Sequence, residues 1–68
     1  MFIEERHEKI LQMLKDKKRV EVQELSELFE VSEDTIRRDL RIMEQKGTVH
    51  RTYGGAILPD KVNSYENF

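Results

Sequence analysis

The fold is determined mainly by residues 20–46, VEVQELSELFEVSEDTIRRDLRIMEQK, where two stretches with helical apolar spacing lie on either side of a short polar turn. Apolar residues recur at this spacing over about 22–29 and again from Ser32 to about 46, which predicts two helices. The turn between them is Glu30-Val31-Ser32. Two helices joined by a turn of three to four residues form a helix-turn-helix unit, which we expect over about 20–46.

The second helix of this unit has clear end signals. Ser32 is a good N-cap, and Glu33 and Asp34 complement the positive end of the helix dipole. Gly47 supplies a C-terminal stop. The apolar stripe that we expect to face the core consists of Ile36, Leu40 and Met43.

Two positions in the unit are locally unfavourable. Glu30 occupies the turn, where Gly or Asn is usual, and a left-handed conformation there costs a bulky residue roughly 1 kcal/mol. Glu21 lies where Ser, Thr or Asp would cap the first helix of the unit. We expect both to weaken local stability without changing the fold.

A further helix and a short strand are predicted before the unit. Ile3, Ile10 and Leu14 repeat at helical spacing and predict an amphipathic helix over about 3–16. Val20-Glu21-Val22 alternates with the period of a very short strand.

A β-hairpin is predicted after the unit. Residues 48–53 and 56–58 are β-favourable, and Gly54-Gly55 between them indicates a hairpin because both glycines tolerate a positive φ. The expected fold is therefore mainly α with a small β-hairpin: a winged helix-turn-helix made of a three-helix bundle and a two-stranded wing.

The 68-residue length allows one small domain, which buries roughly 60% of its unfolded surface. We place this winged helix-turn-helix domain in residues 1–58. The polar, aperiodic segment 59–68 is interpreted as a linker to a C-terminal effector domain that is absent from this chain. The sequence contains no stretch typical of a membrane span or signal peptide, so we expect a cytoplasmic protein that does not contact membranes.

The residue inventory argues against an enzyme. There is no cysteine, and the two histidines, His7 and His50, form no metal motif. No nucleophile is paired with a base, and no glycine-rich phosphate loop is present. We therefore expect neither cofactor nor metal, and interpret both histidines as surface residues.

The net charge of −2 by itself argues against a nucleic-acid partner, because nucleic-acid-binding domains are usually basic. The distribution is uneven, however. Residues 20–34 carry six acids and no base, whereas residues 35–53 carry five bases and two acids. Such a field can orient the domain on a polyanion despite the acidic total.

The helix that begins after Ser32 has a polar face opposite its apolar stripe. At about 100° per residue, the outward side comprises Asp34, Arg38, Arg41 and Gln45, with Thr35 and Arg37 at its edges. A major groove about 12 Å wide admits one helix, and a guanidinium can grip guanine O6 and N7 or a phosphate. Charges on a helix usually serve only solubility, but this helix follows a tight turn and precedes a hairpin that carries Arg51.

Two strings of residues resemble a known family. The first is Ser32-Glu33-Asp34-Thr35-Ile36-Arg37-Arg38-Asp39-Leu40, preceded at matching distances by Arg6, Ile10 and Leu14. The second is Arg51-Thr52-Tyr53-Gly54-Gly55-Ala56, which is similar to the family's wing. Together they resemble DeoR-type regulators over roughly residues 3–58.

This resemblance implies a function. DeoR-type proteins are typically bacterial repressors of sugar or nucleoside catabolism. A larger C-terminal domain binds a phosphorylated sugar and mediates oligomerisation. The resemblance thus implies sequence-specific binding to double-stranded DNA, with the phosphorylated sugar bound only by the absent domain. It also implies a homo-oligomer at full length, whereas this fragment by itself is compatible with a monomer.

The candidate DNA-binding residues are Ser32, Asp34, Thr35, Arg37, Arg38, Arg41, Arg51, Thr52 and Tyr53. Ser32 is foremost a cap, and Thr35 is suited to a phosphate or a thymine methyl. Arg38 is assigned to a base edge and Arg37 to the backbone. Arg51 is suited to a phosphate or the minor groove, and for Tyr53 packing under the wing is favoured over a phosphate contact.

Three further features of the sequence suggest hypotheses. Asp39 lies at the flank of its helix, where we hypothesise an ion pair with Arg6. Ile42 is displaced from the core stripe and is suited to packing beneath the wing or to contact with a partner chain. The alternative function is a winged helix used for protein–protein contact, which would require an exposed apolar patch on the helix after Ser32.

Overall fold

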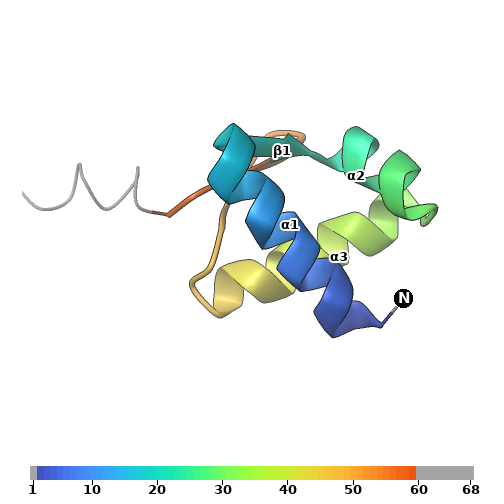
Figure 1. Cartoon of the computed structure of the whole chain (residues 1–68), viewed down its shortest axis with the longest axis horizontal. Coiled ribbons are helices and arrows are strands. Elements are labelled where there is room, and N and C mark those ends of the chain that lie inside the picture. The colour runs from blue at the N-terminus through green and yellow to red at the C-terminus, as the bar shows by residue number, and fades with distance from the viewer. Residues whose placement is uncertain (1, 60–68) are drawn as a thin grey trace, which may run out of the picture.

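Three helices and three short strands make up the computed structural model, which describes residues 2–59. In chain order they are α1 (Ile3–Lys17), β1 (Arg19–Glu21), α2 (Val22–Phe29), α3 (Glu33–Gln45), β2 (His50–Thr52) and β3 (Gly55–Ile57). In Figure 1, α1 crosses in front of α3, and β1 leads along the upper edge to α2. The predicted winged helix-turn-helix is confirmed, with α2 and α3 as the helix-turn-helix unit.

The core lies where the three helices meet the sheet. The predicted apolar stripes of α1 and α3 are buried, because their spacing of three to four residues places them on one side of each helix. The buried apolar residues are Ile10, Leu14, Val20, Val22, Leu25, Ile36, Leu40, Met43, Val49 and Ala56. Full burial of one such aliphatic side chain stabilises the fold by about 1.5–3 kcal/mol, so this cluster fixes the position of α3.

The hairpin of β2 and β3 forms the expected wing, and β1 adds a third strand to it. The sheet order is β1-β3-β2 with both pairings antiparallel, and Val20 pairs with Ala56. The sequence predicted a short strand at 20–22 but not its partner. The strand is shifted by one residue because Val22 already begins α2. Residues 48 and 49, predicted to be strand, instead connect α3 to β2.

The two glycines of the wing have different functions. Gly54 has a φ of +82° and makes the turn, as predicted. Gly55, which was predicted to lie between the two strands, is instead a buried residue of β3 and does not have a positive φ. A Cβ at Gly55 would lie 1.9 Å from the carbonyl oxygen of Val20. Gly55 is therefore needed because the backbones of β3 and β1 approach closely.

The two unfavourable positions of the unit are resolved differently. Glu30 adopts the expected left-handed conformation, with φ 56° and ψ 45°. Glu21 provides no side-chain cap, as expected, but the Val22 N–H donates to the carbonyl oxygen of Gly54 at 2.8 Å. The turn of the wing thus satisfies one free donor at the start of α2. A second left-handed residue, Lys18, ends α1 and was not predicted.

Candidate nucleic-acid interface

The outward face of α3 carries two exposed arginines. Arg38 and Arg41 are exposed, while Ile36, Leu40 and Met43 on the opposite side are buried. Neither guanidinium forms a hydrogen bond or ion pair with any residue between Phe2 and Pro59. This orientation is the one expected from the helical wheel, and all N–H donors of both side chains remain available to a ligand.

The first turn of α3 is held by its cap. The Ser32 hydroxyl oxygen accepts from the Thr35 backbone N–H at 3.1 Å and lies 3.0 Å from the Thr35 hydroxyl oxygen. The predicted capping role of Ser32 is therefore observed. Thr35 is half-buried and its hydroxyl already has a partner, so a DNA contact would use its methyl group or a shared hydroxyl.

Arg37 differs from Arg38 and Arg41 because it is already ion-paired. Its Nη2 lies 3.0 Å from Glu33 Oε1, and its Nη1 lies 3.0 Å from Asp34 Oδ1. The Asp34 side chain is 90% exposed, so this pair is in solvent and contributes little stability. Asp34 thus holds Arg37 on the side of α3 that faces the wing, a role that the sequence did not reveal.

Arg51 is held to α3 by Glu44. Glu44 Oε2 accepts from the Arg51 backbone N–H, and Oε1 accepts from Arg51 Nε, both at 2.9 Å. These hydrogen bonds, first the backbone one, lower the pKa of the Glu44 carboxyl below its usual value. Sequence reasoning missed Glu44 because its partner is seven residues away on another element, beyond the reach of helical periodicity.

A hollow lies between α3 and the wing. Its lining combines cationic side chains with wing backbone: Val22, Arg37, Leu40, Arg51, Thr52, Gly54 and Gly55. Arg37 and Arg51 thus come from different elements and line one surface depression. The arrangement brings together candidate residues that are 14 positions apart in the sequence.

Thr52 and Tyr53 lie at the end of the wing, and both are exposed. The predicted packing of Tyr53 under the wing is wrong, because its side chain is fully exposed. Tyr53 belongs to the tight turn between β2 and β3, beyond the strand positions that face the helices. Its phenol therefore extends the candidate interface with a hydroxyl donor.

A buried polar cluster joins α3 to α1. Arg6 donates to Asp39 through Nε at 2.5 Å and Nη2 at 3.1 Å, which confirms the hypothesised ion pair. Asp39 is only 1% exposed, and its hydrogen bond raises the pKa of Arg6. The expectation that His7 is a surface residue is wrong: its Nε2 is buried, 3.2 Å from Asp39 Oδ1, because α1 crosses α3 at this point. His50 is exposed, as predicted.

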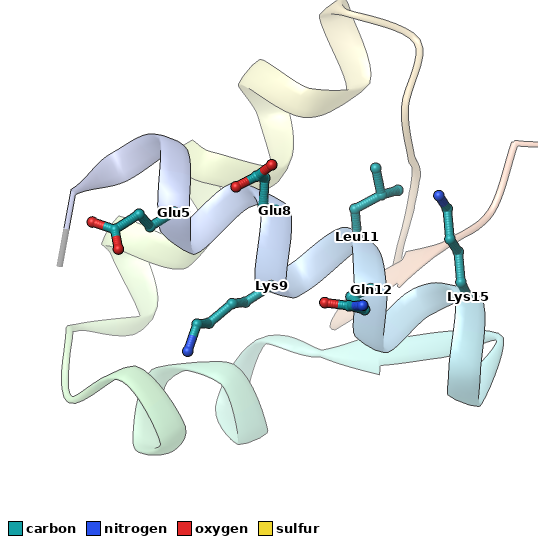
Figure 2. Close-up of a pocket in the computed structure, with 6 residues that line it drawn as sticks. All are labelled: Glu5, Glu8, Lys9, Leu11, Gln12 and Lys15. Atoms are coloured by element: carbon teal, nitrogen blue, oxygen red, sulfur yellow. The ribbon is translucent and has the colours of Figure 1, made fainter.

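A surface depression along α1 has no reactive arrangement. Figure 2 shows its lining side chains, all from α1 and fanning out along the helix rather than converging: Glu5, Glu8, Lys9, Leu11, Gln12 and Lys15.

Within residues 2–59, no three His, Asp or Glu side chains are placed to hold a metal ion. No helix in that range is long and apolar enough to cross a membrane.

The exposed side of α3 gives no support to protein docking. Ile42 is its only apolar residue away from the core stripe, and it is half-buried. A docking face would need a contiguous apolar patch, which α3 does not present.

Comparison with known proteins places these features in a family. The family model of the DeoR-like helix-turn-helix domain matches residues 6–62. The transcriptional regulator GolR of Listeria innocua is 38% identical over the whole chain, which spans 27% of that protein. The transcriptional repressor GlcR of Bacillus subtilis is 44% identical over 96% of the chain, which spans 26% of that protein.

A shorter match is also informative. A putative galactitol utilization operon repressor of Escherichia coli is 52% identical over 76% of the chain and 46% of its own length. The chain thus spans about a quarter of the length of GolR and GlcR and about half of this third relative. The comparison with solved structures gave no significant match.

Proposed function

Because this chain belongs to the DeoR-like helix-turn-helix family and carries a DNA-binding domain of transcriptional regulators, we propose that it reads a specific DNA sequence by placing the outward face of α3 in the major groove. The observation that carries this proposal is the pair of exposed guanidinium groups of Arg38 and Arg41, which have no partner among residues 2–59, on a helix fixed by the core. Guanidinium groups at such positions match guanine O6 and N7 or phosphate oxygens.

The arginines are proposed to contact different parts of the DNA. Arg38 and Arg41 lie opposite the core stripe, so they reach deepest when α3 enters the groove, and Arg38 is assigned to a base edge. Arg37 is assigned to the DNA backbone because its charge is already shared with two carboxylates. On the wing, Arg51, Thr52 and Tyr53 are exposed and suit phosphates or the minor groove.

The first turn of α3 is proposed to approach a phosphate. Ser32 and Thr35 lie at the positive end of the helix dipole, where backbone N–H groups favour an anion. Asp34 would be repelled by phosphate, so its proposed role in DNA binding is to orient Arg37 or to accept from cytosine N4.

The wider assignment concerns domain organisation and regulation. Residues 1–58 are proposed to be the DNA-binding domain and residues 59–68 a linker to an effector domain, which agrees with the greater length of GolR and GlcR. The name of the E. coli relative refers to galactitol utilization. We extend this to repression of a sugar or nucleoside catabolic operon, released by a phosphorylated sugar, in a protein that forms homo-oligomers.

The test begins with duplexes selected by the chain from a random pool. On these, Arg38→Ala is expected to weaken binding by about 1–3 kcal/mol, but to change binding to random duplexes little. Arg51→Ala is expected to weaken binding to both and to lower the salt slope by about one. Lys9→Ala removes an exposed charge from α1 and serves as the control. Equal losses for both arginine variants on selected and random duplexes would refute the division.

A further inference from the structure

One carboxylate of α3 accepts two hydrogen bonds from the wing. Glu44 lies near the end of α3 and uses both oxygens on a single residue of β2: one for the Arg51 backbone N–H and one for Arg51 Nε. The Glu44 side chain is 33% exposed, so water competes only partly for these bonds. His50 Nδ1, the neighbouring titratable group, lies further away, 3.7 Å from Oε2.

This contact leaves the outer part of Arg51 available. A guanidinium has five N–H donors, and Glu44 takes only the one on Nε. Among residues 2–59, no acceptor is hydrogen-bonded to Nη1 or Nη2 of Arg51. Two parallel N–H groups are the arrangement that binds a phosphate in a bidentate manner. Glu44 therefore fixes the direction of the guanidinium without using its phosphate-binding edge.

The charge of Glu44 makes this position unexpected. It is a carboxylate between two elements that are both proposed to approach DNA, where it would be repelled by phosphates. If Glu44 had no function beyond its charge, removing that charge would strengthen DNA binding. A favourable positional effect must therefore outweigh the repulsion for this residue to support binding.

Resting on the proposed function, we propose that Glu44 is a positioning residue for DNA recognition. It fixes Arg51 of the wing relative to Arg38 and Arg41 of α3, so that both elements engage one stretch of duplex at the same time. The wing is also joined to α3 by the four residues between Gln45 and His50 and through the core, where Ala56 lies in one cluster with Ile36, Leu40 and Met43, but neither connection holds the Arg51 side chain. Because Glu44 binds both the main chain and the side chain of Arg51, it sets both the position of β2 and the direction of the Arg51 guanidinium.

The test compares three variants on a duplex selected by the parent chain. Glu44→Gln removes the charge and replaces one of the two accepting oxygens with an NH2 donor, and Glu44→Asp keeps the charge but is shorter by one methylene. Glu27→Gln removes an exposed carboxylate of α2 that has no hydrogen bond or ion pair within residues 2–59. We expect both Glu44 variants to bind about tenfold more weakly, and Glu27→Gln to bind as the parent or slightly more tightly.

Two further readouts separate positioning from a general loss of stability. The salt slope of binding is expected to fall by about one in Glu44→Gln, as if Arg51 had been released from its phosphate. In an Arg51→Ala background the loss caused by Glu44→Gln is expected to shrink to about twofold or less, since the two residues act as one unit. Binding is measured well below the melting temperature of each variant, so the comparison concerns folded protein.

The outcomes are distinct. If the parent selects no duplex, the proposed function fails. If the parent binds but Glu44→Gln binds equally or more tightly, with an unchanged or steeper salt slope, the positioning role is overturned and the proposed function stands. If Glu44→Asp binds like the parent, only the charge of Glu44 matters, and the positioning role is again overturned.

Discussion

At the scale of single residues, Asp39 is the one buried charged side chain among residues 2–59. It is almost fully buried, yet it belongs to the helix whose other face is proposed to meet DNA. Arg6 donates two hydrogen bonds to it, and His7 Nε2 lies 3.2 Å from its Oδ1. A buried carboxylate is tolerated only when it is paired and hydrogen-bonded, so this cluster constrains how α3 crosses α1.

Asp39→Ala should therefore be strongly destabilising. It leaves the Arg6 guanidinium without its partner, and breaking a buried pair on one side costs about 3–5 kcal/mol. Asp16→Ala, which removes an exposed carboxylate of the same type from α1, should cost less than about 0.5 kcal/mol. Urea denaturation followed by circular dichroism measures both. A loss below about 1 kcal/mol for Asp39→Ala would show that the pair does not constrain the fold.

The Glu44 carboxyl predicts a pH dependence with a defined sign. Because its pKa is lowered in the folded state, its contribution to stability is present above the usual value of 4.5 and is lost as the pH falls through the lowered value. The difference in unfolding free energy between the parent and Glu44→Gln should shrink on acidification below that value. Denaturant titrations at a series of pH values measure it. A difference that grows on acidification would contradict the assigned ion pair.

At the scale of elements, the wing is part of the domain rather than an appendage. Strand β3 pairs on one side with β2 and on the other with β1, and the Gly54 carbonyl accepts from the first N–H of α2. The hairpin therefore stabilises the start of the helix-turn-helix unit, where Glu21, as expected, provides no side-chain cap. A substitution that displaces the turn of the wing is therefore expected to destabilise the start of α2 as well.

The glycines of the wing test this packing. Gly55→Ala would place a Cβ against the Val20 carbonyl oxygen. Because the Cβ is fixed to the backbone of β3 and the oxygen belongs to the backbone of β1, the two strands would have to separate, which should cost about 3 kcal/mol. Gly54→Ala meets no atom within 4 Å and should cost only about 1 kcal/mol for its positive φ. Thermal and urea unfolding of the two variants rank them directly. A smaller loss for Gly55→Ala than for Gly54→Ala would mean that β1 and β3 are not closely paired.

The elements themselves could largely be predicted, because helices depend on local spacing. The predicted ranges for α1 and α2 and the cap of α3 agree with the structure within one or two residues. Contacts between elements could not be predicted in the same way. The pairing of β1 with β3, the Glu44–Arg51 contact and the exposure of Tyr53 depend on how distant segments meet in space, which no repeat in the sequence encodes.

At the scale of the whole molecule, the net charge of −2 conceals a division between elements. Exposed acids dominate α2, while the outward side of α3 carries Arg38 and Arg41. Part of the acidic charge is also used internally, since Glu33 and Asp34 pair with Arg37 and Glu44 pairs with Arg51. The total charge is therefore a poor guide to the partner, and we propose that the arrangement of exposed charges orients the domain on DNA.

The proposed function places the arginine-bearing side of α3 in a major groove. The most direct measurement is dimethyl sulfate footprinting of a selected duplex, because the reagent methylates guanine N7 in the major groove and adenine N3 in the minor groove. The parent chain should protect guanine N7 positions within its site, and Arg38→Ala should lose part of that protection while Lys9→Ala retains it. Tight binding with every guanine N7 still reactive, and protection confined to adenine N3, would contradict the claim.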